Sequence, residues 1–483
     1  MTARQSASIT TDASPEQGAD PSRLTRRLRI LLAIVIIADV LDLMDSTITT
    51  IAAPTIVREI GGGESLIKWL GASYALAMGV LLVVGGRLGD RYGKRRTFLI
   101  GIVGFVAASL LCGLSVSPAM LIASRIAQGS FGALLIPQGI SILTATFSRA
   151  QIPRAVSAFG PAMGISAVLG PIVAGFIIDA DIAGLTWRPI FLINIILGTV
   201  GFAAALTYLP HDLPSSDVVI DGLGAGLLGA SMLGLMYGLI QGSTAGWTLG
   251  PILSIVIGAT LFGGFGLRQY TATNPLIIPS LLRNRGFTAG LVLGFAFFAA
   301  VSGFPYVVSL FFQTALGFTP SRAAIGLAPV MIGIIGASLV ARPLVTTLGR
   351  QLVVIGLLIT LAGAGGLWVT VGREGISVGV WAMAPSLVAL GIGMGVAFSS
   401  IFDVALGNIA PSEGGSASGS LSAVQQLATA VGAAVVTTVY FGQRTAHGPV
   451  HAMTISIAVV GCIAAVCLGL VWLLPRNAPV DEE

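Results

Sequence analysis

The chain has 483 residues, of which 55% are hydrophobic and 9% are charged, and its mean hydropathy is +0.94. A soluble domain carries about 25% charged residues, so this composition excludes an ordinary soluble protein and indicates a membrane protein with many spans. The net charge of +5 does not indicate nucleic-acid binding, because the basic residues lie at the ends of apolar stretches. Cys112, Cys462 and Cys467 lie within such stretches and form neither a disulfide framework nor a zinc pattern.

The amino-terminal segment predicts a tail and a membrane anchor. Residues 1–22 are polar and rich in Ser, Thr and Ala, which is typical of disorder. Four arginines follow within residues 23–29 and predict a cytoplasmic anchor in front of the first helix. The apolar stretch after them is too long for a signal peptide and lacks a small-residue cleavage site. We therefore expect an uncleaved first helix.

Fourteen apolar runs, separated by charged or Pro- and Gly-containing turns, predict an all-α polytopic membrane protein with fourteen transmembrane helices. The runs lie at about 30–53, 66–86, 97–115, 119–143, 154–178, 188–209, 221–241, 250–269, 287–312, 323–342, 351–371, 379–402, 417–440 and 452–474. The predicted limits are 1–29 for a cytoplasmic tail, 30–210 for an N-terminal six-helix bundle, 211–270 for two additional helices, 271–286 for a cytoplasmic linker, 287–475 for a C-terminal six-helix bundle, and 476–483 for a second cytoplasmic tail.

The basic residues predict the orientation in the membrane. With the N-terminus inside, eighteen Lys and Arg residues lie on the cytoplasmic side and six lie outside. This bias follows the positive-inside rule and predicts two cytoplasmic termini in a multi-pass protein of the cell membrane. A weak internal repeat places Tyr92-Gly93-Lys94-Arg95 and Leu348-Gly349-Arg350-Gln351 at the same position of the two six-helix blocks. Repeated halves are typical of carriers with a site near the midplane.

The first span contains three aspartates, Asp39, Asp42 and Asp45. One acid at the centre of a membrane helix costs about 2.5–3.5 kcal/mol on insertion scales, so we expect all three to face protein or a water-filled cavity. At 100° per residue they sweep an arc of about 120°, so they cannot all face one point. Asp42 is a candidate second protonation site or a counter-charge for a cationic substrate. Asp39 is a weaker substrate-binding candidate, because a hydrogen bond between helices explains it as well.

Three other features stand out along the chain. The segment Gly85–Arg96 places six charges and four glycines in a short cytoplasmic turn. Gly93 can supply the positive φ of a tight reversal, and Asp90 can pair with a nearby Arg or lie at a helix N-terminus. Gly170-Pro171 is expected to break the fifth helix and to shape a gate there. Arg125, a cation within a span, needs an acidic or carbonyl partner.

The Gly85–Arg96 segment resembles the loop signature of the major facilitator superfamily. Further segments narrow the resemblance to the fourteen-helix drug:proton antiporter branch. Asp45–Pro54 resembles its first-helix motif, Arg125–Gly129 its fourth-helix motif, Gly164–Gly175 its antiporter motif, Trp187–Asn194 the start of its sixth helix, Asn274–Phe287 its eighth-to-ninth connection, and Gln425–Leu427 its thirteenth-helix signature. The resemblance implies two six-helix bundles with two extra helices between them.

The resemblance also implies roles for single residues. Asp45 and Arg125 would belong to a proton-coupling network, to which we add Asp42 from its position. The loop motif comprises Gly86, Asp90, Arg91, Gly93, Lys94 and Arg95, and the antiporter motif comprises Gly164, Gly170, Pro171 and Gly175. Candidate substrate-binding residues are Asp39, Asp42, Gln425 and Gln426. Neither Asp39 nor Asp42 belongs to the family motif.

We therefore predict a proton-coupled antiporter that exports small amphiphilic organic compounds, with cations favoured. Its partners would be protons, the substrate and the lipid bilayer, with no nucleic acid and no cofactor beyond the proton gradient, and it would act as a monomer. A lipid exporter of the same fold and a proton-coupled uptake symporter remain alternatives. An enzyme is disfavoured because no His lies in any span. His447 and His451 have metal-compatible spacing but no acidic neighbours, so we expect no metal site.

Overall fold

The structure is a computed structural model that describes residues 24–148, 151–212, 219–406, 409 and 413–475. In these residues every regular element is a helix, which confirms the predicted all-α class. The first half contains α1 (Arg26–Ile60), α2 (Gly63–Tyr92), α3 (Lys94–Gly113), α4 (Pro118–Thr146), α5 (Ile152–Ala180) and α6 (Pro189–Tyr208). Two helices follow, α7 (Gly222–Ala245) and α8 (Leu249–Thr271). The second half contains α9 (Pro279–Arg283), α10 (Arg285–Thr314), α11 (Pro320–Ala341), α12 (Val345–Leu348), α13 (Arg350–Glu374), α14 (Val380–Leu406), α15 (Gly414–His447) and α16 (Pro449–Leu470).

Thirteen helices among the described residues are long and apolar enough to cross a membrane. The fourteenth long helix is α1, whose 35 residues exceed the length needed but include the three aspartates. Together they give the predicted order of six helices, two helices and six helices. The limits of the domains stay a prediction.

The two halves repeat one packing pattern. In the first half α3 packs against α4 and α6, and in the second half α13 packs in the same way against α14 and α16. The turns before α3 and α13 both use a glycine with positive φ, 96° at Gly93 and 49° at Gly349. This conformation is readily adopted only without a side chain, so the internal repeat seen in the sequence has a matching backbone.

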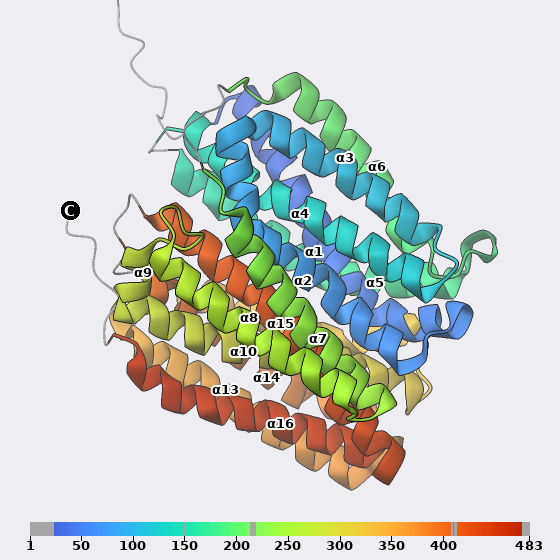
Figure 1. Ribbon diagram of the computed structural model, residues 1–483. Coiled ribbons are helices and arrows are strands. Elements are labelled where there is room, and N and C mark those ends of the chain that lie inside the picture. Colours follow the sequence, from blue (N-terminus) through green and yellow to red (C-terminus); the bar gives the residue numbers. More distant parts are fainter. Residues whose placement is uncertain (1–23, 149–150, 213–218, 407–408, 410–412, 476–483) are drawn as a thin grey trace, which may run out of the picture.

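The halves meet along α2 with α15 and along α5 with α11. Figure 1 shows α7 and α8 along the seam between the blue-to-teal first half and the yellow-to-red second half. There α7 contacts both α2 and α15. The extra helix pair therefore adds to the interface between the halves without entering either repeat.

The helices reach beyond the predicted apolar spans. α1 begins at Arg26, so part of the predicted tail is helical, and its first turn is capped by Thr25, whose hydroxyl accepts from the Leu28 N–H at 3.3 Å. The predicted linker 271–286 contains the short helix α9, where Leu281 is buried with Phe287. Helices continue past the apolar spans because polar residues extend them into the interfacial layers of a bilayer.

The expected break of the fifth helix is wrong. α5 continues through Gly170 and Pro171 to Ala180. A proline removes one hydrogen bond, but membrane helices tolerate it because neighbouring groups satisfy the freed carbonyl.

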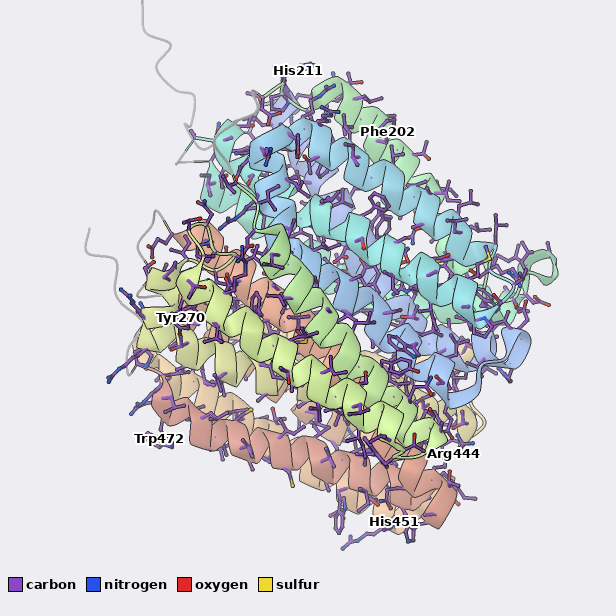
Figure 2. All side chains as sticks on the ribbon, viewed as in Figure 1. Phe202, His211, Tyr270, Arg444, His451 and Trp472 are labelled. Carbon is purple, nitrogen blue, oxygen red and sulfur yellow. The ribbon has the colours of Figure 1, made fainter. Side chains whose placement is uncertain are left out.

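Exposed aromatic side chains lie at one end of the bundle, and basic side chains lie at the other. Figure 2 shows Tyr270 and Trp472 at one end and Arg444 and His451 at the opposite end. Tyr270 is 66% exposed and Trp472 is 68% exposed, as expected for side chains at a membrane–water interface.

Candidate functional site

Asp45 lies at the centre of a buried polar network. Its side chain is 0% exposed, and its Oδ2 forms an ion pair with Nη1 of Arg125, which is 1% exposed. The other oxygen, Oδ1, accepts from Nε2 of Gln128 and from Nδ2 of Asn194, both at 2.7 Å. α1, α4 and α6 thus supply the groups, and both carboxylate oxygens have partners, as a buried charge requires.

The same network reaches α3 through Ser109. The Ser109 hydroxyl accepts from Gln128 at 2.8 Å and donates to the Phe105 carbonyl of its own helix at 2.8 Å. Gln128 in turn accepts from Arg125 at 2.7 Å through its side-chain oxygen. Arg125 and Gln128 lie three residues apart on α4, so both side chains project from one face of that helix.

Asp42 occupies a second environment, one turn from Asp45. The Tyr74 hydroxyl of α2 donates to Asp42 Oδ1, and the Tyr74 ring lies beneath Arg125, with the guanidinium carbon 4.3 Å from the ring centre. α2 and α4 come close here because Gly129 has no side chain: a Cβ on it would lie 2.3 Å from the Tyr74 carbonyl oxygen. The structure thus brings Asp42, Asp45 and Arg125 together through one tyrosine.

Asp39 occupies a third environment, away from both acids' partners. It is 6% exposed, and its Oδ1 has no hydrogen-bond partner in the described part of the chain. It lines a cavity with residues of α4 and α5. Asp39 therefore lies apart from the linked Asp42 and Asp45, and the three acids do not face one point, as the 120° arc predicts.

The loop motif joins α2 to α3, and its acid does not lie at the N-terminus of α3. Asp90 is exposed, and the N-terminus of α3 is capped instead by Asp212, whose carboxylate accepts from the N–H groups of Lys94 and Arg95. Arg91 is exposed and lies over Tyr92. Of the two roles predicted for Asp90, the helix N-terminus is occupied by Asp212 from the segment after α6, whereas Arg87 lies near enough to interact electrostatically with Asp90.

A second arginine of the same turn contacts the segments around the extra helices. Arg87 donates to the Val219 carbonyl at 3.1 Å and also to the Pro275 carbonyl. Near it, Asp221 caps α7 by accepting from the Gly224 N–H at 2.9 Å, and it pairs with Arg268 at 2.8 Å. Burial acts to raise the pKa of Asp221, but the Arg268 and Gly224 hydrogen bonds and the nearby positive charges outweigh it and hold that pKa below its usual value.

The antiporter-motif residues of α5 lie at close contacts with other helices. A Cβ on Gly170 would lie 2.6 Å from the Thr47 hydroxyl of α1, and one on Gly175 would lie 2.7 Å from Cα of Ser321 at the start of α11. Gly164 faces Ile335 of α11. Pro171 lies within the helix and is buried. These glycines allow α5 to touch both its own half and the opposite one, as small residues do in membrane helix interfaces.

The two glutamines of α15 are not part of the acid network. Gln426 donates to the Met78 sulfur of α2 at 3.1 Å, across the interface between the halves. Gln425 and Gln426 are both half-buried. Met78 lies one turn from Tyr74 on α2, so Gln426 is near the network without bonding to it in the described residues.

The end of the bundle where α1 ends is held by hydrogen bonds between the two halves. Tyr306, Ser309 and Gln313, all on α10, donate to backbone carbonyls of α2 and α1, namely those of Ile67 at 2.8 Å, Thr50 at 2.8 Å and Ile51 at 2.9 Å. The Ser321 N–H of α11 also donates to Asp179 of α5 at 3.0 Å. In the described residues, this end is therefore closed across the interface.

Sequence reasoning missed four members of the network: Tyr74, Ser109, Gln128 and Asn194. Gln128 and Asn194 lie within the segments Arg125–Gly129 and Trp187–Asn194 that carry the family resemblance. The spacing of Gln128 three residues after Arg125 is a signal that could have identified it. Tyr74 offers no such signal, because a single tyrosine in an apolar span is usually part of the core.

A bundle of two equivalent helical halves, with a buried acid–guanidinium network in one of them, defines a membrane carrier rather than an enzyme. Residues 35–433 match the model of the Major Facilitator Superfamily. The chain belongs to that superfamily.

Similarity to individual proteins agrees with this assignment. The chain is 39% identical to a probable actinorhodin transporter of Streptomyces coelicolor, over 91% of this chain and 77% of that protein. It is 26% identical to a puromycin resistance protein of Streptomyces alboniger, over 96% and 94% of the two chains. The predicted resemblance to drug-exporter-like members is thus confirmed. A crystal structure of a D-xylose–proton symporter shares the fold, with a TM-score of 0.65, 17% identity, and 93% and 98% of the two chains covered.

Proposed function

We propose that this chain is a proton-coupled antiporter that exports small amphiphilic compounds of the natural-product type across the cell membrane by alternating access. It would act as a monomer with both termini in the cytoplasm, driven by the proton gradient alone. The observation that carries the proposal is the buried Asp45 carboxylate, closed on Arg125, Gln128 and Asn194. The names of the relatives, a probable actinorhodin transporter and a puromycin resistance protein, support the substrate class.

The network offers a physical route for coupling. A proton on Asp45 removes the counter-charge of Arg125 and leaves a buried cation. Breaking such a pair costs about 3–5 kcal/mol, close to the roughly 5.5 kcal/mol that moves a two-state equilibrium from 1:99 to 99:1. Protonation of this one carboxylate is therefore strong enough to favour a second arrangement of α1, α3, α4 and α6.

The closed end of the bundle supports alternating access. Thr50 and Ile51, whose carbonyls accept hydrogen bonds from α10, follow Asp45 on the same helix by five and six residues. A rotation or shift of α1 on protonation would disturb these bonds directly. Proton and substrate need only stabilise different states of this interface to be coupled.

The test uses the purified full chain in lipid vesicles that enclose a pH-sensitive dye. Adding puromycin to wild-type vesicles with a pH gradient is expected to move protons in the opposite direction to the compound. Asp45→Asn should reduce this movement at least tenfold, whereas Glu374→Gln, which removes an exposed acid at the end of α13, should not change it.

The other outcomes separate the rival functions. Protons and compound moving in the same direction would show an uptake symporter. Transport of fluorescent phospholipid without transport of the added compound would show a lipid exporter. Proton movement that survives Asp45→Asn would exclude this acid as the coupling group.

A further inference from the structure

The strongest feature that the coupling network does not use is a cavity of about 250 Å³ beside Asp39. It lies between α1, α4 and α5, and its lining is Asp39, Ile140, Leu143, Thr144, Phe147, Ile152 and Ala155. Phe147 follows α4 and Ile152 opens α5, so the cavity is near the end of the bundle where α1 begins. The sequence predicts this end to be cytoplasmic.

Asp39 is the one charged side chain among the described residues that line the cavity. It is 6% exposed and its Oδ1 lacks a hydrogen-bond partner within the described residues. Thr144 does not supply one, because its hydroxyl donates to the carbonyls of Ile140 and Ser141 on its own helix, at 3.1 and 3.2 Å. The lining thus offers this carboxylate no donor, and an unpaired buried charge is costly.

The lining also limits what can bind. Mg²⁺ and Ca²⁺ need about six or more oxygen ligands, which one carboxylate and one hydroxyl in an apolar wall cannot provide. An organic ammonium group carries its own donors and can have an apolar body that packs against Leu143, Phe147 and Ile152. Whole-drug sites are about 300–1,000 Å³, so this cavity is large enough for a small amine or for one amine-bearing arm of a larger compound.

We propose that this cavity is a recognition site for an alkylammonium group, with Asp39 as its counter-charge. Asp39 and Asp45 then have separate tasks, since they lie six residues, or about 9 Å, apart along α1. The role of the site in choosing cargo rests on the proposed export function, but the binding itself does not.

Binding is measured by titration calorimetry on the purified full chain in detergent without added aminolipid. The probes are 4-phenylbutylamine and its N-acetyl derivative, which has a similar shape but no charge. Wild type is expected to bind the amine at least tenfold more tightly than the derivative, and Asp39→Asn should bring the two affinities within twofold of each other. Glu374→Gln, an exposed acid remote from the cavity, serves as the charge-matched control and should behave as wild type.

A second variant guards against a folding defect in Asp39→Asn. Ala155→Leu fills the cavity without changing its charge and should weaken binding of both probes. Tight amine binding that survives either variant, or equal binding of both probes to wild type, overturns the proposal, because Asp39 would then not be the counter-charge of a bound amine in this cavity.

The ammonium could come from an exported compound or from a lipid headgroup. Repeating the titration in nanodiscs of phosphatidylglycerol alone and with phosphatidylethanolamine separates these sources: a tenfold loss of amine affinity in the second membrane identifies the aminolipid as the occupant of the same site. Amine binding through Asp39 without compound-driven proton movement in vesicles would refute the export function and leave the site standing. Compound-driven proton movement without amine binding through Asp39 would refute the proposed site and leave the export function standing.

Discussion

The guanidinium carbon of Arg125 lies 4.3 Å from the centre of the Tyr74 ring. The Tyr74 hydroxyl also donates to Asp42. The ring face of Tyr74 therefore contacts Arg125, the ion-pair partner of Asp45, while its hydroxyl contacts Asp42. The two acids of α1 that carry the coupling hypothesis are therefore linked through α2, which also packs along α15 of the second half. A structural change at either acid can therefore reach the interface between the halves through the contacts of α2.

Tyr74→Phe separates the two roles of this ring. The variant keeps the ring beneath Arg125 but leaves the buried Asp42 carboxylate without its donor, so the free energy of unfolding should fall by about 1–3 kcal/mol. Tyr74→Leu should lower the free energy of unfolding by about 0.5–2 kcal/mol more, since the cation–π contact with Arg125 is lost as well. Both are measured by denaturant unfolding of the purified protein, with Tyr237→Phe, an exposed tyrosine of α7, as control. Equal stability of Tyr74→Phe and wild type would contradict a structural role for the hydroxyl.

Much of this arrangement could be predicted from the sequence because burial of charge leaves few options. Arg125 needed an acid, the first helix carried three, and the pair with Asp45 satisfies that need. The order of helices followed from apolar runs of sufficient length. The sequence did not reveal that Tyr74 links two acids, because a side chain's partner on another helix depends on how the helices pack.

The errors have equally specific causes. Gly170-Pro171 was expected to break α5, but the helix continues because its neighbours tolerate one missing hydrogen bond. A helix N-terminus was one of two places predicted for Asp90, but Asp212, more than a hundred residues away in sequence, lies at the N-terminus of α3. The helix dipole favours an acid at such a position, but local rules do not identify which acid of the folded chain reaches it.

Gly175→Ala should open the end of the bundle that is closed across the halves. The added Cβ would lie 2.7 Å from Cα of Ser321 and 2.8 Å from the Pro320 carbonyl oxygen, so α5 and α11 must separate. The readout is the labelling rate of Thr50→Cys by a membrane-impermeant maleimide, in a background where the exposed Cys462 is replaced by Ser. We expect Thr50→Cys to be labelled several-fold faster in the protein that also carries Gly175→Ala than in the protein that keeps Gly175.

The matched control is Gly372→Ala on α13, where nothing lies within 4 Å of an added Cβ. It should leave the labelling rate unchanged. An unchanged rate in Gly175→Ala would mean that the contact between α5 and α11 does not keep this end closed.

Asp221 should make the stability of α7 depend on pH. Its pKa in the folded protein is below the ordinary value of 3.8, so its contribution is fully present above that value and is lost as the pH falls through the folded pKa. Asp221→Asn keeps a capping side chain but removes the charge that faces the half-exposed Arg268. Wild type should exceed this variant by up to about 1 kcal/mol at pH 7, and the difference should vanish in acid. Melting temperatures of both proteins across this range provide the measurement, and a difference that grows in acid would reverse the assigned sign.

Lys68 and Ser243 give substitutions with opposite expected signs. Lys68 on α2 is fully buried, and its Nζ donates to the Ser243 hydroxyl of α7 at 2.8 Å. In the described residues Lys68 forms no salt bridge, so the fold holds a buried ammonium with a hydroxyl as its hydrogen-bond acceptor. Lys68→Met removes that charge and fills a similar volume, and it should be neutral or stabilising by about 1–4 kcal/mol.

Ser243→Ala takes away the acceptor and keeps the charge, so it should lower the free energy of unfolding by about 1–3 kcal/mol. Adding Lys68→Met to Ser243→Ala should then recover most of this loss, because no buried ammonium is left without an acceptor. The part not recovered is the hydrogen bond that the Ser243 hydroxyl accepts from Thr438 of α15 at 3.2 Å. Denaturant unfolding of the four proteins closes this cycle. Additive effects in the double variant would show that α2 and α7 are not held together through this hydrogen bond, and that the ammonium finds its partner elsewhere.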